Sequence, residues 1–239
     1  MDHTGGHVLP SLLAALPVVA ACAHHDGGGG HGGHGGHGGH GAGDGHDGHR
    51  FDDVERWRER FEGEDRAEWQ KPDELVAALG LKPGDAVADL GAGTGYFSRR
   101  LAAAVAPDGV VYATDIEPNM VAHLRDDSAK RGLTNLVPVL ARPDDPTLPV
   151  GELDLVFICN TIHHFPDIPR YLAAVLASVK VGGRMVVVDW AKRETPMGPP
   201  LEIRMSREEI VAAAEGAGWK PVELSFILPY QSVVVFQRP

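Results

Sequence analysis

A glycine-rich turn at residues 89–95, which reads Asp-Leu-Gly-Ala-Gly-Thr-Gly, has the residue types and spacing of a ligand-binding loop. Glycine lets the backbone turn tightly and lets a ligand approach the main-chain N–H groups at the start of the following helix. The glycines stand at alternate positions, unlike the G-x-G-x-x-G pattern of dinucleotide binders. Asp89, directly before the first glycine, would repel a pyrophosphate and attract an ammonium group. We therefore expect a ligand that carries an amino group.

Three more polar residues lie where they could take part in chemistry. Asp115 stands 20 residues beyond Gly95, at the end of a predicted strand, where a carboxylate can accept hydrogen bonds from both hydroxyls of a ribose. His163 and His164 follow a later strand, and an imidazole with an ordinary pKa of about 6.5 can remove a proton near neutrality or orient a substrate. Either histidine could equally cap the next helix or fill space.

Strand-like and helix-like segments alternate from residue 51 onward, which is typical of a layered α/β fold. Helices are expected at 51–62 and 73–80, and Ser206 with Glu209 forms a capping box that predicts a later one. Strands are expected at 85–90, 110–114, 136–140, 153–159 and 184–190.

Two β-rich runs, 222–228 and 231–237, are separated only by Pro229 and Tyr230, so we expect them to pair as an antiparallel hairpin. The predicted fold is α/β and Rossmann-like, with a mostly parallel seven-stranded sheet, a C-terminal antiparallel hairpin and helices on both faces. In open sheets of this kind the ligand binds outside the carboxyl ends of the strands. The glycine-rich turn, Asp115 and the histidine pair should therefore meet at one edge of the sheet.

Four segments together carry a resemblance to a known family: 87–95 (VADLGAGTG), 111–120 (VYATDIEPNM), 153–165 (LDLVFICNTIHHF) and 179–190 (VKVGGRMVVVDW). In this order and spacing they resemble the class I S-adenosylmethionine (SAM) dependent methyltransferases. The segment with the two histidines is similar to that of the small-molecule methyltransferases grouped with the ubiquinone and menaquinone C-methyltransferases. The resemblance implies an enzyme that uses SAM to methylate a small molecule by direct displacement.

The resemblance also implies roles for single residues. The glycine loop would hold the methionine moiety of SAM, with Asp89 near its amino group. Asp115 would bind the ribose and Ile116 would pack on the adenine, while Asp144 or Asp145 would face the adenine amine. The residues expected to bind the cofactor are Asp89, Gly91, Gly93, Gly95, Asp115, Ile116, Asp144 and Asn160, and those expected to be catalytic are His163 and His164.

Several other functions are disfavoured. A formal net charge of −11 makes nucleic acid an unfavourable partner. A nucleic-acid N-methyltransferase is expected to show (Asp/Asn)-Pro-Pro-aromatic where this chain reads Asn160-Thr161-Ile162-His163. Arsenite methyltransferases hold arsenic with several cysteines, whereas Cys159 is the only cysteine after residue 49 and lies in an apolar strand. A NAD-dependent oxidoreductase is disfavoured by the loop spacing and by Asp89.

The first 49 residues differ from the rest in composition. An apolar run at 8–21 ends in Val-Ala-Ala-Cys, which resembles the lipobox of bacterial lipoproteins, although no Lys or Arg precedes it. We expect 1–22 to be a lipoprotein signal segment that anchors the protein at a membrane, periplasmic or cell-surface, through a lipidated Cys22. A misplaced start codon or a chance apolar stretch is the alternative, and the protein would then be cytoplasmic. The glycine-dense residues 23–49 are expected to be a disordered linker to a folded domain at 50–239.

The linker carries histidines on a three-residue period, and imidazoles on a flexible chain can bind Zn or Ni. The candidate ligands are His31, His34, His37 and His40. Because SAM is made in the cytosol, an exported methyltransferase would lack an obvious cofactor supply. The alternative function is therefore a membrane-tethered metal-binding protein whose methyltransferase-like fold is a non-catalytic binding module.

Substrate specificity is expected to come from parts outside the shared core. The proline-rich loop 191–205 carries Lys192, Arg193 and Arg204, so it could be a lid with basic groups for an anionic substrate, or a solvated connection. Trp69 could be a core residue or a platform for the cofactor, and Tyr230 could face the same pocket.

Overall fold

The structure is a computed structural model that describes residues 54–63, 65–224 and 226–239. The predictions for residues 1–49, including the lipidated Cys22 and the metal ligands His31, His34, His37 and His40, lie outside the described residues. Within the described ranges, no helix is both long enough and apolar enough to cross a membrane.

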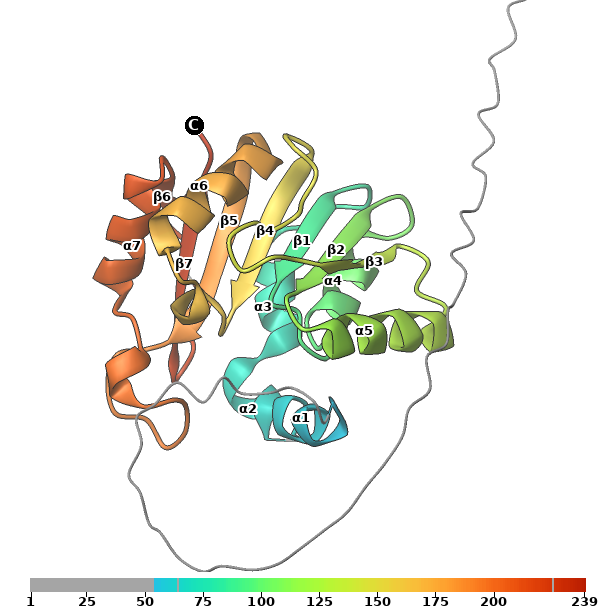
Figure 1. Ribbon diagram of the computed structural model, residues 1–239. Coiled ribbons are helices and arrows are strands. Elements are labelled where there is room, and N and C mark those ends of the chain that lie inside the picture. The colour runs from blue at the N-terminus through green and yellow to red at the C-terminus, as the bar shows by residue number, and fades with distance from the viewer. Residues whose placement is uncertain (1–53, 64, 225) are drawn as a thin grey trace, which may run out of the picture. The chain divides into compact units, whose positions relative to one another are not determined.

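One seven-stranded sheet runs through the described part of the chain, in the order β3-β2-β1-β4-β5-β7-β6 (Figure 1). Strands β1 to β5 are parallel to one another, and β7 is antiparallel to both β5 and β6. The predicted fold class is confirmed. The strands are β1 (Ala86–Leu90), β2 (Val110–Asp115), β3 (Leu136–Leu140), β4 (Leu153–Cys159), β5 (Val179–Trp190), β6 (Lys220–Val222) and β7 (Gln231–Gln237).

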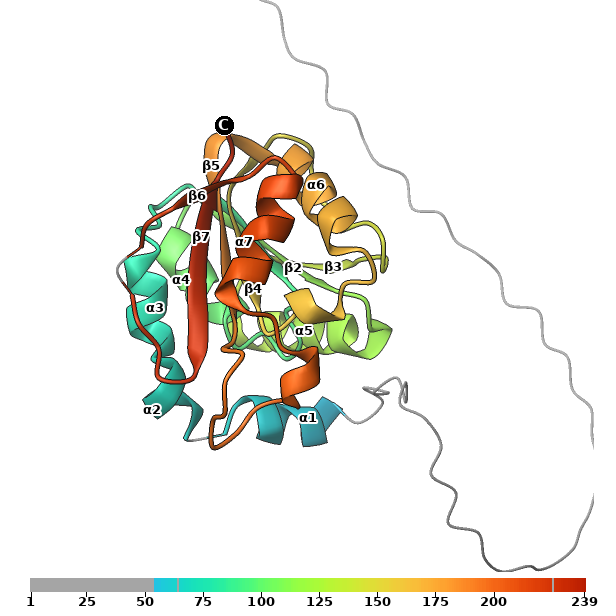
Figure 2. The same ribbon diagram turned by 90° about the vertical axis from the view of Figure 1, so that its left-hand side faces the viewer.

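Helices cover both faces of this sheet, with α3 and α4 on one side and α6 and α7 on the other (Figure 2). The central strands are almost continuously apolar because both of their faces are buried. The helices are α1 (Val54–Phe61), α2 (Arg66–Gln70), α3 (Pro72–Ala78), α4 (Ser98–Val105), α5 (Pro118–Arg131), α6 (Ile168–Ser178) and α7 (Arg207–Gly216), with short 3₁₀ turns η1 (Ile162–His164) and η2 (Leu201–Ile203).

The local signals explain how several helices begin. The predicted capping box is present at α7, where the Ser206 hydroxyl accepts from the Glu209 N–H and the Glu209 carboxylate accepts from the Ser206 N–H. Pro72 is the first residue of α3, where the missing N–H of proline costs no hydrogen bond within the helix. The sequence did not predict α2, a five-residue helix that ends at Lys71, whose φ of 46° is left-handed.

The predicted C-terminal hairpin has the right pairing direction but the wrong first strand. β6 is only Lys220–Val222, and it pairs with the far end of β7, Lys220 opposite Gln237. Of residues 223–230, expected to be mostly strand, those that the structure describes form no strand. Their apolar side chains, above all the buried Leu228, pack into the core on the face of α3 and α4, so burial rather than strand pairing fixes this segment.

The loop 191–205 is held together by Arg204, a side chain that is only 6% exposed. Its guanidinium donates hydrogen bonds to four backbone carbonyls and to the Thr195 hydroxyl, and it lies over the Trp190 ring with 5.7 Å from Cζ to the centroid. Lys192 pairs with Glu209, and Arg193 donates to the Pro229 carbonyl. The expectation that these cations form a basic lid is wrong for Arg204, which is committed to the loop itself.

We predict that Arg204→Lys will loosen this loop although the positive charge is retained. An ammonium group cannot reproduce the fork of guanidinium donors, and each buried acceptor left unpaired costs about 1–3 kcal/mol. Hydrogen exchange of the amides in residues 191–205 should become faster. Arg193→Lys, the same change at an exposed position of the loop, serves as the control, and equal exchange in the two variants would contradict the role assigned to Arg204.

Candidate active site

The glycine-rich turn leads from the end of β1 into α4, at the carboxyl edge of the sheet. Gly91, Gly93 and Gly95 have φ of 69°, 54° and 83°, a left-handed conformation that glycine adopts without strain. A Cβ at Gly91 would lie 2.4 Å from the Thr161 side chain, and one at Gly95 would lie 2.8 Å from Leu124. The backbone conformation therefore favours glycine at all three positions, and the Thr161 side chain leaves no room for a Cβ at Gly91.

Asp115 ends β2 beside this loop and is tied to it by main-chain donors. The Gly93 N–H donates to Asp115 Oδ2 at 2.9 Å, and the Glu117 N–H donates to Oδ1 at 3.0 Å. Burial raises the pKa of Asp115, while these N–H groups oppose the rise. The next residue, Ile116, is 51% exposed, so an apolar surface lies directly beside the carboxylate. The structure thus brings together the residues expected to bind ribose and adenine.

Asp89 is the most deeply buried carboxylate near the loop, at 2% exposure. The Ser98 hydroxyl donates to its Oδ2 at 2.6 Å, which ties β1 to the first residue of α4. Burial raises the pKa of Asp89 to about 6, and the hydrogen bond from Ser98 opposes that rise. An ammonium group near this carboxylate would offset the cost of burying its charge.

Thr94, inside the loop, points to a missing partner. It is 1% exposed, and its hydroxyl oxygen has no hydrogen-bond partner among the described residues. Buried hydroxyl groups are almost always hydrogen-bonded, so an unpaired one in a glycine loop fits a site completed by a ligand. The loop therefore suits a ligand with polar groups, as the expected cofactor has.

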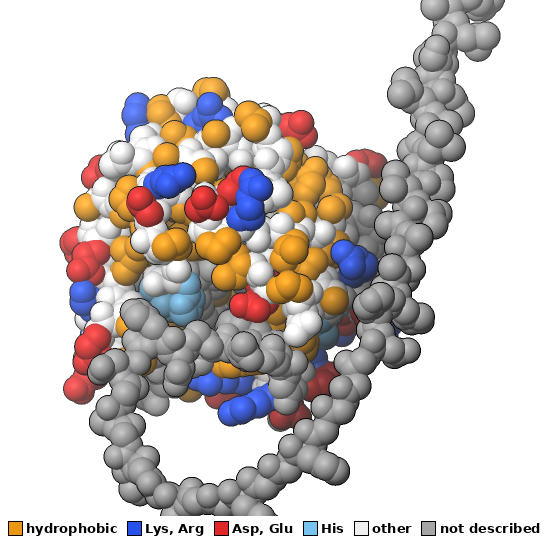
Figure 3. Space-filling view, viewed as in Figure 1, with side chains coloured by type: hydrophobic (Ala, Val, Ile, Leu, Met, Phe, Trp, Pro, Cys, Tyr) orange, Lys and Arg blue, Asp and Glu red, His pale blue; other side chains and the backbone are white. Residues whose placement is uncertain are grey.

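The two histidines differ in their surroundings. The His163 side chain is 5% exposed, and its Nδ1 lies 2.8 Å from Oδ2 of Asp189, which is fully buried near the end of β5. Because a carboxylate only accepts, Nδ1 carries a hydrogen and donates it to Asp189. Nε2 has no hydrogen-bond partner within the described ranges. His164 is exposed, and histidine surface is visible in the lower half of Figure 3.

A set of side-chain amides, which the sequence did not reveal, extends from α2 to the end of β4. Arg66 of α2 donates to Gln70, Gln70 donates to Gln231 of β7, and Gln231 donates to Asn160. Gln70 also lies 3.3 Å from the Cys159 sulfur. Cys159 is partly buried and packs against the core, and burial raises the pKa of its thiol to about 12.

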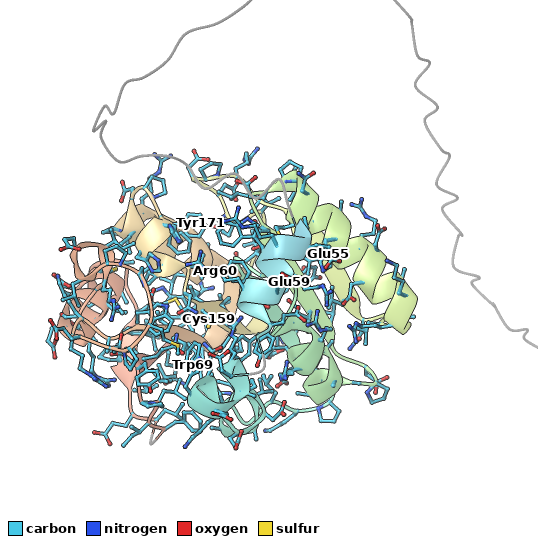
Figure 4. All side chains as sticks on the ribbon, turned by 90° about the horizontal axis from the view of Figure 1, so that it is seen from below. Glu55, Glu59, Arg60, Trp69, Cys159 and Tyr171 are labelled. Atoms are coloured by element: carbon cyan, nitrogen blue, oxygen red, sulfur yellow. The ribbon has the colours of Figure 1, made fainter. Side chains whose placement is uncertain are left out.

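Three aromatic rings lie beside these amides. The Trp69 ring is 5.0 Å from that of Trp190 and 6.2 Å from that of Tyr230, measured between centroids. Figure 4 looks onto the carboxyl ends of the strands, with α1 on the near side and Trp69 and Cys159 at this edge. The structure thus places Trp69 and Tyr230 side by side, as the sequence suggested, and adds Trp190 to form one aromatic wall.

The acidic residues after β3, Asp144 and Asp145, lie near arginine side chains. Asp145 forms an ion pair with Arg142 and accepts the Thr147 N–H at 2.7 Å. Asp144 is exposed and lines a hollow of ≈ 540 Å³ together with Arg142, Asp145 and Arg170. Contact between Asp144 and an adenine stays a prediction.

Comparison with known proteins agrees with this geometry. A family model described as a methyltransferase domain matches residues 87–183, from β1 to the middle of β5. A SAM-dependent methyltransferase from Aquifex aeolicus superposes with a TM-score of 0.73 at 26% identity, over 78% of this chain and 99% of that protein. Residues 87–183 form a methyltransferase domain, within the fold of the class I SAM-dependent methyltransferases. The glycine loop and Asp115 occupy the ligand edge expected for this domain.

Curated methyltransferases match about half of the chain. The ubiquinone/menaquinone biosynthesis C-methyltransferase UbiE of Ectopseudomonas mendocina is 30% identical over 123 residues, 51% of this chain and 48% of that protein. The demethylmenaquinone methyltransferase of Symbiobacterium thermophilum is 32% identical over 127 residues, 52% of this chain and 51% of that protein. The chain thus spans about half the length of these relatives. A geranyl diphosphate methyltransferase solved with SAM, at 16% identity and a TM-score of 0.59, supports the fold alone.

We predict that Asp89→Asn will stabilise the ligand-free methyltransferase domain at neutral pH. Because the folded pKa of about 6 exceeds the 3.8 of an ordinary aspartate, stability is lost as pH rises from 3.8 through 6 and stays lost above it. The amide avoids this loss and can still accept from Ser98. The free energy of unfolding should be measured with urea at several pH values between pH 4 and pH 7.5. Above pH 6 it should be higher in the variant than in the parent by on the order of 2–3 kcal/mol.

The matched control is Asp126→Asn, which removes an exposed carboxylate from α5. An equal gain in both variants would show that net charge, and not the burial of Asp89, causes the effect.

Proposed function

We propose that this chain uses SAM to methylate a small molecule. The proposal rests chiefly on the glycine loop, whose left-handed backbone is tied to Asp115 and whose Thr94 hydroxyl lacks a partner among the described residues. The names of the curated relatives, which concern C-methylation in quinone biosynthesis and demethylmenaquinone, support a small-molecule acceptor.

The residues present suit each part of SAM. Asp115 would accept from the ribose hydroxyls, and the exposed Ile116 would cover one face of the adenine. Asp89 would attract the ammonium group, while Arg66, a partly buried cation that lies 4.1 Å over the Tyr96 ring, would attract the carboxylate. When bound, SAM supplies a methyl group activated by the adjacent positive sulfur.

His163 is the group we assign to proton removal. Its Nε2 would accept the proton that the acceptor atom loses as it gains the methyl group, and Asp189 would stabilise the resulting imidazolium. The pair is held rigidly, because Asp189 Oδ1 also accepts the Trp190 N–H at 2.7 Å. Positioning alone suffices for a strong nucleophile, so the base matters most for an acceptor that must be deprotonated.

Calorimetric titration tests the cofactor assignment. We expect SAM and S-adenosylhomocysteine to bind in the micromolar range and NADH not to bind. Asp115→Ala should weaken SAM by about 100-fold, because two charge-assisted hydrogen bonds to the ribose are lost. Asp126→Ala, on the exposed side of α5, is the control. Binding of NADH alone, or unchanged SAM affinity in Asp115→Ala, would refute the assignment.

Kinetics on an acceptor found by screening with this protein test the role of His163. His163→Gln should lower kcat by roughly 100-fold or more at pH 7, with SAM affinity unchanged, and the loss should shrink at high pH, where the acceptor ionises unaided. Asp189→Asn should also lower kcat at pH 7, by a smaller factor, because the imidazolium loses the carboxylate that stabilises it. If His164→Gln removes activity and His163→Gln does not, the base is misassigned.

The features of the first 49 residues stay predictions. Anchoring at a membrane through Cys22 would appear as a lipid-modified mature N-terminus in mass spectrometry. Zn or Ni binding by His31, His34, His37 and His40 would appear as binding to the full chain that residues 50–239 lack. Among the described residues, no group of three or more His, Cys, Asp or Glu side chains is placed to hold a metal ion.

A further inference from the structure

Four side chains form a one-directional relay of hydrogen bonds at the carboxyl edge of the sheet. Arg66 Nε donates to Gln70 Oε1 at 2.5 Å, and Gln70 Nε2 donates to Gln231 Oε1 at 2.8 Å. Gln231 Nε2 then donates to Asn160 Oδ1 at 2.6 Å. The relay joins α2, the first residue of β7 and the residue after β4.

The direction of this relay is set by its first member. An amide can face a neighbour with either its oxygen or its nitrogen, but a guanidinium has donors only. Arg66 therefore requires the oxygen of Gln70, which turns the Gln70 NH₂ toward Gln231. The same constraint passes to Gln231 and leaves the Asn160 oxygen engaged.

Burial keeps the relay in this one arrangement. Gln70 is 0% exposed and Gln231 is 5% exposed, so water is not at hand to satisfy a reversed amide. Reversing either one would face oxygen to oxygen and nitrogen to nitrogen inside the protein, at a cost comparable to losing two hydrogen bonds. Asn160 consequently presents its NH₂ away from Gln231.

Asn160 stands at the junction of the cofactor loop and the aromatic wall. Its φ of 55° is left-handed, a conformation that asparagine tolerates better than most residues and that is often found at functional sites. The next residue, Thr161, lies directly against Gly91. Gln231, on the other side, is opposite Trp190 in the β5–β7 register. The Asn160 NH₂ has no partner within the described part of the chain.

We propose that the Asn160 NH₂ binds an oxygen of the methyl acceptor, and that the relay from Arg66 makes this site select an acceptor with a carbonyl, carboxylate or phenolate oxygen over one with an ammonium group. The inference rests on the proposed function, since it places the acceptor beside the cofactor loop. Asn160 is then a specificity residue, and Gln70 and Gln231 are positioning residues that act through it.

The test compares two ring compounds of similar size, benzoate and benzylammonium, on the protein saturated with S-adenosylhomocysteine. Side-chain amide signals in ¹⁵N NMR spectra report contact with Asn160, and titration gives the two affinities. We expect benzoate to shift the Asn160 NH₂ signals and to bind about 10-fold more tightly than benzylammonium, as a charge-assisted hydrogen bond allows.

Two substitutions change the hydrogen bonds of the relay while keeping the side chains at similar size. Asn160→Asp presents oxygen in place of NH₂, so it should reverse the preference in favour of benzylammonium. Gln231→Met removes the hydrogen bond that orients Asn160, so the preference should fall toward unity while S-adenosylhomocysteine still binds. Gln237→Glu, an added charge on the exposed end of β7, controls for long-range electrostatics and should leave the preference unchanged.

The outcomes separate the two proposals. If S-adenosylhomocysteine does not bind, the proposed function fails. If it binds but neither probe shifts the Asn160 signals, or both bind equally, the selection by Asn160 is wrong. Retention of the full preference in Gln231→Met would overturn the role of the relay, and the same reversal in Gln237→Glu as in Asn160→Asp would assign the effect to net charge.

Discussion

Buried carboxylates at the ends of parallel strands are the constraint on which this site depends. Asp89 near the end of β1 and Asp189 near the end of β5 are buried, and Asp115 at the end of β2 is partly buried. A buried charge is tolerated only where donors surround it. Here the donors are a serine hydroxyl, main-chain N–H groups of the glycine loop and an imidazole. Satisfying the carboxylates therefore fixes the turns that form the site.

Hydrogen bonds between side chains also link parts of the chain that are far apart in sequence. The fold leaves the carboxyl edge open, and α2 supplies Arg66 and Gln70 to this edge from one side while β7 supplies Gln231 from the other. Because β7 is inserted between β5 and β6, its first residue lies beside the end of β5. In the proposed function, the antiparallel strand β7 thus contributes to the acceptor side of the site, whereas the parallel strands β1 and β2 contribute to the cofactor side.

Local patterns in the sequence predicted those parts of the site in which the functional residues directly follow a strand. The glycine loop, Asp115 and the histidine after β4 each follow a strand that the apolar pattern marks, and the structure brings them to one edge. Asp189 was not singled out, although an acid near the end of the apolar run 184–190 was a signal that could have found it. Gln70 and Gln231 lie 161 positions apart, and no periodicity connects them. Arg204 was misread because its charge suggested solvent, while the fold supplies carbonyls for it inside the loop.

The packing of Trp69 against Trp190 gives the molecule an optical property. Trp69 belongs to α2 and Trp190 to β5, and their rings lie 5.0 Å apart at a tilt of 34°. Indoles this close couple their electronic transitions, so the near-ultraviolet circular dichroism of the protein contains a signal whose sign and size depend on how α2 sits against the sheet. A displacement of α2 against the sheet would therefore change the circular dichroism spectrum, so the motion can be followed without a label.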